Sequence, residues 1–207
     1  QFCENEIRIP IFSRPWWLDA VCGKTNWDVA IVENNDHILA TLPYYRVKKN
    51  VIGMPLLTQA MGPWFHPSTA KYAKQLSQQK NLMTALIDRL PPVDYFGQNF
   101  HYSITNWLPF YWKGFSQTTR YTYVIEDLTD LDMIWKSLQA NIRREIRKAL
   151  KLTTVRTGLD MDTFLKVNAL TFQRQGRQLP YTKELVRRWE EACKEHNARE
   201  TSHHQNR

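Results

Sequence analysis

The stretch Trp27–Tyr45, WDVAIVENNDHILATLPYY, decides the fold of this chain. Its two halves, Trp27–Glu33 and His37–Tyr45, are rich in the β-branched and aromatic residues that favour strands. The three residues between them, Asn34–Asp36, have the composition of a hairpin turn, because Asn and Asp tolerate a positive φ angle. The stretch therefore predicts two antiparallel strands joined by a short turn.

Helical and extended patterns alternate on both sides of this hairpin. Apolar residues recur at near-helical spacing over Ser68–Leu90, and Pro91-Pro92 ends that pattern. Besides the hairpin, the elements expected in this half are an extended Ile7–Phe12, a helix over Pro15–Cys22 with Ser13 as its N-cap, an extended Leu57–Phe65, a helix over Ser68–Leu90 and a strand over Val93–Ser103. This order predicts an α/β (α+β) fold with a mixed, largely antiparallel sheet flanked by helices.

A similar order of elements begins again near residue 119. The elements expected there are a strand over Thr119–Asp127, a long helix over Leu131–Lys151, a short strand over Thr153–Thr157, and helices over Met161–Gln175 and Thr182–Asn197. Asp130 and Thr182 are the expected N-caps, and the apolar residues of the long helix define one stripe that we expect to be buried. We therefore predict two domains of the same broad type, residues 1–118 and residues 119–207.

Basic residues outnumber acidic ones, and the excess is concentrated in one segment. The chain has 28 Lys and Arg against 20 Asp and Glu, a formal net charge of +8. Lys136–Arg156 holds seven basic residues and a single acidic one, Glu145. This concentration indicates a polyanionic partner, such as a phosphate-bearing ligand, RNA or an anionic membrane surface. A solvated helix face that binds nothing specific explains the charge equally well.

Four of these cations are the strongest candidates for a binding site. On a helix, Arg143 and Arg147 share one face, and Arg144 and Lys148 share the adjacent one. Two cationic stripes beside an apolar stripe can hold a phosphate group, because guanidinium groups make bidentate contacts with phosphate oxygens. The spacing therefore predicts a phosphate-binding surface made by these four side chains.

The connection between the two predicted domains is dense in aromatic residues. Asn106–Trp112 reads NWLPFYW, which is too rich in aromatic side chains for a simple linker. Its residues Trp107, Tyr111 and Trp112 either line a groove for an extended ligand or pack the two domains together, and the sequence favours neither interpretation.

Several classes of enzyme lack their signatures in this sequence. There is no nucleophile elbow, zinc-protease motif, Walker loop or dinucleotide-binding glycine motif. Gln173–Gln178 superficially resembles an acetyltransferase phosphate loop, which needs a strand before it and a helix after it. This segment instead follows a predicted helix and ends in Leu179-Pro180, so the sequence favours a turn between two helices. Spacing marks no residue as a general base, so no catalytic residue is assigned, and neither a metal site nor a bound cofactor is expected.

Hydropathy and cysteine usage bear on the location of the protein. No apolar run approaches the roughly 18–20 residues that span a bilayer, and no secretory leader is recognised after Gln1. Cys3, Cys22 and Cys193 are too few and too scattered for a disulfide framework or a four-ligand zinc site, so we expect reduced thiols. These observations predict a cytoplasmic protein with no integral membrane segment.

Three segments resemble the FemAB-like proteins of the Gcn5-related acetyltransferase (GNAT) superfamily. They are Phe12–Val21 (FSRPWWLDAV), Thr105–Trp112 (TNWLPFYW) followed by Arg120–Tyr123, and Asn141–Ala149 (NIRREIRKA). The last segment is similar to the N/K-x-R-x-x-I-R-K-A helix of the family and is the most specific of the matches. Together the segments extend over most of residues 10–180.

The resemblance implies two GNAT-like domains in tandem, the second incomplete because the chain ends at Arg207 before the expected completing strands. Members of the family transfer amino acids from aminoacyl-tRNA to the peptide stem of a peptidoglycan precursor, or acyl groups from a thioester donor such as acyl-CoA. An amine attacks an activated carbonyl while the protein orients both substrates and stabilises the oxyanion. The basic helix would then face the phosphates of the donor or the diphosphate of a lipid-linked precursor.

Two other functions are compatible with the same residues. A non-catalytic module that binds nucleic acid explains the charge of +8 and the aromatic connection, and it predicts affinity that falls steeply with salt. Peripheral association with an anionic membrane through the basic helix is the third interpretation. The sequence favours the transferase because the charge is clustered on one helix and no nucleic-acid-binding motif is present.

Overall fold

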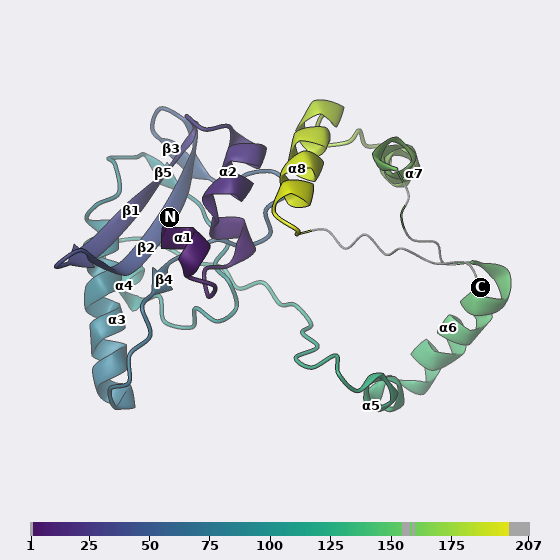
Figure 1. Cartoon of the computed structure of the whole chain (residues 1–207), viewed down its shortest axis with the longest axis horizontal. Coiled ribbons are helices and arrows are strands. Elements are labelled where there is room, and N and C mark those ends of the chain that lie inside the picture. The colour runs from purple at the N-terminus through teal and green to yellow at the C-terminus, as the bar shows by residue number, and fades with distance from the viewer. Residues whose placement is uncertain (1, 155–157, 159, 199–207) are drawn as a thin grey trace. The chain divides into compact units, whose positions relative to one another are not determined.

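A hairpin of two long strands forms the centre of the fold (Figure 1). β1 (Trp27–Asn34) pairs antiparallel with β2 (His37–Lys48). In the turn, Asn35 and Asp36 have φ angles of 47° and 62°, a left-handed conformation that Asn and Asp adopt more readily than most residues. The predicted hairpin and its turn are therefore confirmed.

The computed structural model describes residues 2–154, 158 and 160–198, and these residues form two units. One unit contains residues 2–116 together with residues 165–198, and the other contains the described part of residues 117–164. All the described strands belong to the first unit.

Three short strands complete a five-stranded sheet around the hairpin. The strand order is β1–β2–β3–β5, and β4 pairs with another part of β2. β3 (Val51–Gly53) and β4 (Trp64–Phe65) are antiparallel to β2, whereas β5 (Tyr95–Phe96) is parallel to β3. The predicted mixed and largely antiparallel sheet is confirmed.

Two segments predicted to be extended contain much shorter strands than expected. Of Leu57–Phe65 only β4 is a strand, and of Val93–Ser103 only β5 is one. Gly62 has a φ angle of 110°, and a Cβ atom placed on it would lie 2.9 Å from the ring of Phe100. The chain therefore bends at this glycine to let an aromatic ring approach the backbone, and beside it Met61 forms a single isolated bridge instead of a ladder.

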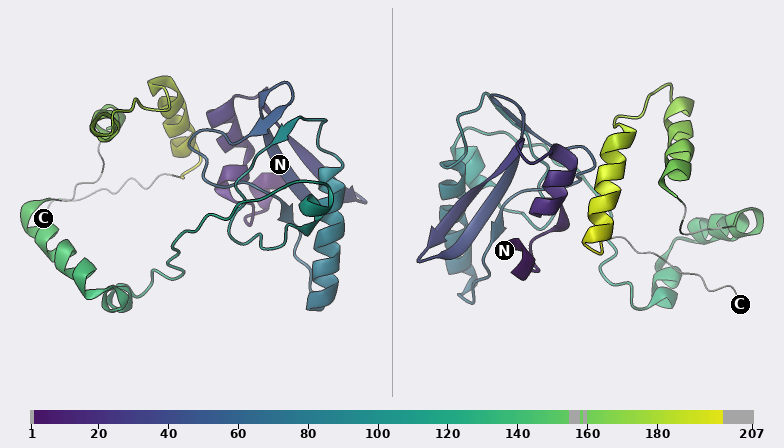
Figure 2. Two further views of the ribbon diagram at one scale, coloured as in Figure 1. Left: turned by 180° about the vertical axis from the view of Figure 1, so that it is seen from behind. Right: turned by 45° about the horizontal axis from the view of Figure 1, so that its top comes forward.

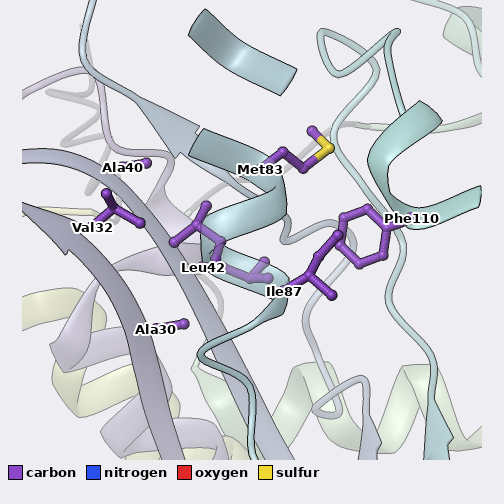
Figure 3. Packing of buried hydrophobic residues seen from close by; sticks show 8 residues of the cluster. Ala30, Val32, Ala40, Leu42, Met83, Ile87 and Phe110 are labelled. Atoms are coloured by element: carbon purple, nitrogen blue, oxygen red, sulfur yellow. The ribbon is translucent and has the colours of Figure 1, made fainter. Parts of the chain in front are cut away.

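One face of the sheet is covered by α3 (Tyr72–Ile87) and α4 (Leu108–Trp112). Successive side chains of a strand point to opposite faces, so every second residue of β1 and of β2 reaches this core. The buried side chains of the core, most of them labelled in Figure 3, are Ala30, Val32, Ala40, Leu42, Met83, Leu86, Ile87 and Phe110. The predicted helix before Pro91 is confirmed, with tighter bounds.

The opposite face of the sheet packs against α2 (Pro15–Cys22), which in turn contacts α8 (Lys183–Glu195) (Figure 2). Trp27 and Tyr45 of the hairpin strands pack there, against a cluster that includes Trp17 and Cys193. Helices therefore flank both faces of the sheet, as the sequence predicts.

The predicted N-caps of these two helices have different outcomes. Ser13 is not the cap of α2, because it belongs to a short 3-10 helix; Arg14 precedes α2, and Pro15 starts it with a φ angle that suits a first turn. The hydroxyl of Thr182 accepts a hydrogen bond from the backbone N–H of Leu185, so the predicted cap of α8 is confirmed. Two further short helices lie near the N-terminus, α1 (Phe2–Asn5) and η1 (Ile11–Ser13). The helix that precedes α8 is α7 (Met161–Arg174).

The second unit contains no strand in the part that the structure describes. The predicted strand over Thr119–Asp127 is wrong, because these residues are exposed and pair with no other strand among those described. A β-prone sequence forms a strand only where a neighbour satisfies its backbone groups. The predicted strand over Thr153–Thr157 lies mostly outside the described residues.

The long helix predicted over Leu131–Lys151 is two helices, α5 (Leu131–Ser137) and α6 (Ala140–Leu152). Leu138 and Gln139 separate them in an extended conformation, with ψ angles of 146° and 148°. The prediction of one continuous helix is therefore wrong, although nearly all of the segment is helical.

Side chains at both ends of α5 explain its bounds. The carboxylate of Asp130 accepts a hydrogen bond from the backbone N–H of Met133 at 2.9 Å, which confirms the predicted N-cap. At the other end, the hydroxyl of Ser137 donates to the carbonyl oxygen of Ile134 at 2.7 Å. Such a local bond competes with the backbone ladder and favours the end of a helix.

The apolar stripe of this segment is not buried as expected. No side chain of α5 or α6 is buried, and Leu131 and Leu150 are 69% and 64% exposed. A helix face is buried only when a second layer covers it, and the described part of this unit contains no sheet for the stripe to pack against.

Candidate functional site: the basic helix α6

The corner between α5 and α6 depends on Arg143. Its Nη1 donates to the carbonyl oxygens of Lys136 and Leu138 at 2.8 and 2.6 Å, and to that of Trp135 at 3.5 Å. The last carbonyl groups of a helix have no partner within it and lie at the negative end of its dipole, so a guanidinium group is stabilising there. Arg143 is thus half-buried and engaged within the protein itself.

Arg147 lies one turn further along α6 and packs on an aromatic ring. The carbon of its guanidinium group is 5.3 Å from the centre of the Trp135 ring, which is a cation–π contact. A guanidinium group has five N–H donors, and a contact with a ring does not consume them, so they can still bind an anion. Arg147 is therefore oriented by the ring and has no carboxylate partner among the described residues.

Arg144 and Lys148 share one carboxylate on the exposed side of α6. Arg144 Nε and Lys148 Nζ lie 3.3 and 3.2 Å from Oε1 of Glu145. The three side chains are 68%, 63% and 58% exposed, in the order Arg144, Lys148, Glu145. Exposed ion pairs contribute only about 0–1 kcal/mol, so an incoming anion can replace the carboxylate at little cost.

The structure brings the four predicted cations onto one helix but gives them different roles. Arg143 caps α5, whereas Arg144, Arg147 and Lys148 remain able to bind an anion. Lys151, one turn after Arg147 and also exposed, joins them, and sequence analysis did not single it out although its spacing was visible. Together these side chains form an open surface that can donate several charge-assisted hydrogen bonds to phosphate oxygens, with an affinity that salt would screen.

The three aromatic residues predicted to line a groove lie in or beside α4. Tyr111 and Trp112 are 61% and 60% exposed, whereas Trp107 is half-buried against the core beneath this helix. The rings of Trp107 and Tyr111 meet edge to face with centres 5.7 Å apart, and Nζ of Lys80 is 5.9 Å from the centre of the Trp112 ring. The groove itself stays a prediction.

A cavity lies beside the hairpin turn, where sequence analysis expected no site. Its volume is about 760 Å³, and its walls include the turn residues 34–36 together with Phe2, Glu6 and His66. A second cavity of about 250 Å³ lies near Arg8 and Met61. Neither cavity is lined by a predicted site residue.

Glu6, in the wall of the larger cavity, is tied to Arg8. Its carboxylate accepts hydrogen bonds from Nε and Nη2 of Arg8 at 2.7 and 2.6 Å, and from the backbone N–H of Arg8 at 3.0 Å. These bonds lower the pKa of Glu6 to about 2. An acidic and a basic residue two positions apart are common in any sequence, so no pattern could have marked this pair.

Three further observations limit the chemistry of the described residues. None of the helices in the described part of the chain is long and apolar enough to cross a membrane. Among the same residues, no group of three His, Cys, Asp or Glu side chains is arranged to hold a metal ion. Burial raises the pKa of the Cys22 thiol to about 12, so this cysteine stays protonated and unreactive at neutral pH.

Comparisons of the chain with protein family models, with curated proteins and with solved structures found no match. Among the predicted sites, the cationic surface of α6 has the most specific geometry.

Proposed function

We propose that this chain is part of a FemAB-like N-acyltransferase in which α6 binds the phosphate groups of a substrate. The observation that carries the proposal is the surface formed by Arg144, Arg147, Lys148 and Lys151 on a helix with one carboxylate, Glu145. These cations extend over two turns, about 10 Å, so neighbouring ones can together contact a diphosphate or adjacent phosphates on one strand.

The fold is compatible with this proposal in two respects. A mixed, mostly antiparallel sheet flanked by helices is the architecture that the resemblance to the GNAT superfamily implies. All three resembling segments overlap helices, because Phe12–Val21 overlaps α2, Thr105–Trp112 contains α4, and Asn141–Ala149 lies within α6. A likeness to the superfamily and a second GNAT-like unit remain part of the proposal.

The proposed reaction joins an amine to an activated acyl group. The nitrogen of the acceptor attacks the carbonyl carbon, a C–N bond forms, and the C–S bond of acyl-CoA or the C–O ester bond of aminoacyl-tRNA breaks. The leaving thiol or hydroxyl takes up the proton that the amine loses. Both donors carry phosphates remote from the carbonyl, as does a lipid-linked precursor, and binding energy at such remote groups orients the reacting atoms.

Phosphate binding is tested by calorimetry with coenzyme A, inorganic pyrophosphate and tRNA. The variant Arg144→Glu/Lys148→Glu removes two exposed cations from α6, and we expect its affinity to fall at least about tenfold. The matched control, Lys48→Glu/Lys49→Glu, makes the same change of charge at exposed positions where β2 ends. An equal loss in both variants would show that only the net charge matters.

Transfer is tested with labelled acyl-CoA, or with charged tRNA and a lipid-linked peptidoglycan precursor. The assay uses this chain and any longer protein that contains it, and it follows the label into an amide product. Phosphate binding without transfer by the longest such protein would reject acyl transfer.

A non-catalytic nucleic-acid-binding module is the second candidate, and one observation favours it. Tyr111 and Trp112 present exposed rings, and Lys80 lies near the ring of Trp112. Exposed aromatic rings beside cations are the usual platform for unpaired bases. In that case Trp112→Ala should weaken single-stranded RNA binding by about 1–3 kcal/mol, and affinity should fall steeply with salt. Affinity confined to coenzyme A and pyrophosphate would reject this candidate.

A further inference from the structure

Helix α6 separates its apolar side chains from its cationic ones. With 3.6 residues per turn, Ile142, Ile146, Ala149 and Leu150 occupy about one third of its circumference. The cations occupy the adjoining arc, and they are Arg143, Arg144, Arg147, Lys148 and Lys151.

A second helix of the same chain shows what normally happens to such an apolar face. α8 has 13 residues, as α6 does, and it buries Val186 and Cys193, which are 2% and 4% exposed, while it packs against α2. α6 buries no side chain fully: its Ile146 is half-buried, and its Ile142 and Leu150 are 44% and 64% exposed. Within the described residues, the apolar face of α6 therefore lacks the covering layer that α8 has.

The charge of α6 identifies the kind of partner that would cover this face. Another apolar element of a protein would match only the isoleucine and leucine side chains, and the exposed cations would take no part in the contact beyond their one carboxylate, Glu145. An anionic bilayer matches both faces, because acyl chains accept the apolar side chains and lipid phosphates accept the cations. Each Lys or Arg close to an anionic surface raises the affinity about fivefold.

The dimensions and the side chains of α6 fit a helix that lies in the membrane plane. Thirteen residues extend about 20 Å, which is too short to cross the hydrocarbon core. The long stems of Arg147 and Lys151 allow their charged ends to reach the headgroups while the helix rests at the acyl boundary. Arg143 holds the corner before α6, so the helix is formed before it meets the surface.

We infer that α6 docks on the surface of an anionic phospholipid bilayer, with Ile142, Ile146 and Leu150 at the acyl boundary. The cations that contact lipid phosphates are Arg144, Arg147, Lys148 and Lys151, because Arg143 caps α5. This docking does not require the protein to be a transferase. If the proposed function is also correct, docking would bring the phosphate-binding cations to the depth at which a lipid-linked precursor carries its diphosphate.

The experiment is sedimentation of the chain with vesicles of phosphatidylcholine alone or of phosphatidylcholine mixed with phosphatidylglycerol. We expect binding to the anionic vesicles at least about tenfold stronger than to the neutral ones, and weaker as salt is added. Ile142→Ser/Ile146→Ser changes no charge and should reduce binding at least about tenfold, because the helix loses apolar contact with the acyl boundary.

Two charge variants complete the design. Arg144→Glu/Lys148→Glu should reduce binding about a hundredfold or more, because two attractive charges become repulsive ones. Lys48→Glu/Lys49→Glu, with the same change of charge outside α6, should reduce it less than about threefold. Far-UV circular dichroism of each variant confirms that it is folded, as we expect because none of these positions is buried.

Three results would overturn the inference. The first is equal vesicle binding by the wild-type chain and Ile142→Ser/Ile146→Ser, which would show that the apolar face is not used. The second is a wild-type dimer that this variant dissociates in size-exclusion chromatography, which would assign the face to a second copy. The third is that poly-glutamate displaces the chain from vesicles and that Ile142→Ser/Ile146→Ser binds vesicles as the wild type does. This result would indicate an acidic protein partner.

The same variants separate this inference from the proposed function. Ile142→Ser/Ile146→Ser should keep its affinity for pyrophosphate, because these side chains lie outside the cationic surface. Failure of vesicle binding with pyrophosphate binding intact would overturn only the docking inference. Vesicle binding without amide formation would overturn only the transferase.

Discussion

The two units of this chain differ more in burial than in sequence composition. In residues 2–116 and 165–198, a sheet with helices on both faces buries side chains such as Leu18, Leu42 and Leu86 completely. In the described part of residues 117–164, apolar residues are about as frequent as in the first unit, yet none of them is buried. Apolar periodicity therefore creates a core only where a second layer covers it.

The same contrast appears in two arginines that donate hydrogen bonds to carbonyl groups at the C-terminal ends of helices. Arg188 Nε donates to the carbonyl oxygen of Ala20 at 2.5 Å, joining positions 168 residues apart in the chain. Arg143 does the equivalent for α5 with carbonyl groups only five to eight residues away. The bond of Arg188 holds two parts of a folded core together, whereas the bonds of Arg143 hold only a local corner.

The largest effect that we predict comes from truncating the core. Leu42→Ala should lower the free energy of unfolding by about 2–5 kcal/mol, because Leu42 is fully buried between the sheet and α3. Leu150→Ala in α6 should change it by less than about 0.5 kcal/mol, because this side chain is 64% exposed. Urea denaturation measures both. Similar losses in the two variants would show that residues 117–164 are packed after all.

The second prediction concerns the contact that joins α8 to α2. Arg188→Met keeps the length of the side chain but leaves the buried carbonyl group of Ala20 without this donor, and it should cost about 1–2 kcal/mol. Arg177→Met, at an exposed position between α7 and α8, is the control and should cost less than about 0.5 kcal/mol. Equal melting temperatures of the two variants would contradict the prediction, because they would show that residues 165–198 do not pack against the rest of the first unit.

Local signals in the sequence predict most of the first unit. The turn at Asn35-Asp36 and the cap at Thr182 depend on the chemistry of one or two side chains, and both are as expected. α4 was not predicted, because Asn106–Trp112 was interpreted as an aromatic connection between domains, although a proline such as Pro109 is favoured in the first turn of a helix. The strand expected over Thr119–Asp127 has strong β-propensity, but a strand also needs a neighbour, which no local pattern supplies.

The candidate site is predicted in part, for a similar reason. Spacing placed Arg144, Arg147 and Lys148 on one helix, because helical periodicity is local. It did not show that Arg143 points back to the carbonyl groups of α5, since that role exists only because the helix is interrupted at Leu138. Arg143 binds the carbonyl groups that lack partners at the end of α5, and only the three-dimensional structure shows where those groups lie.

The third prediction tests the local corner. Arg143→Ala should accelerate amide hydrogen exchange in α5 about fivefold, because the last carbonyl groups of α5 lose their donor at a cost of about 1 kcal/mol. Arg144→Ala, at the adjacent position, should change exchange less than about twofold, because its partner Glu145 is exposed. Global stability should not change in either variant. Equal exchange in both would mean that Arg143 does not hold the corner.

The smallest effect concerns a single ion pair of the first unit, and it depends on pH. Hydrogen bonds from Arg8 lower the pKa of Glu6 to about 2, so the ionised carboxylate is stabilised in the folded state. Its contribution to stability is fully present above the usual pKa of a glutamate, about 4.3, and it is lost as pH falls towards 2. Glu6→Gln should therefore melt at a lower temperature than the wild type at pH 6, and the difference should disappear near pH 2. A difference that is independent of pH would mean that Glu6 acts through packing and not through its charge.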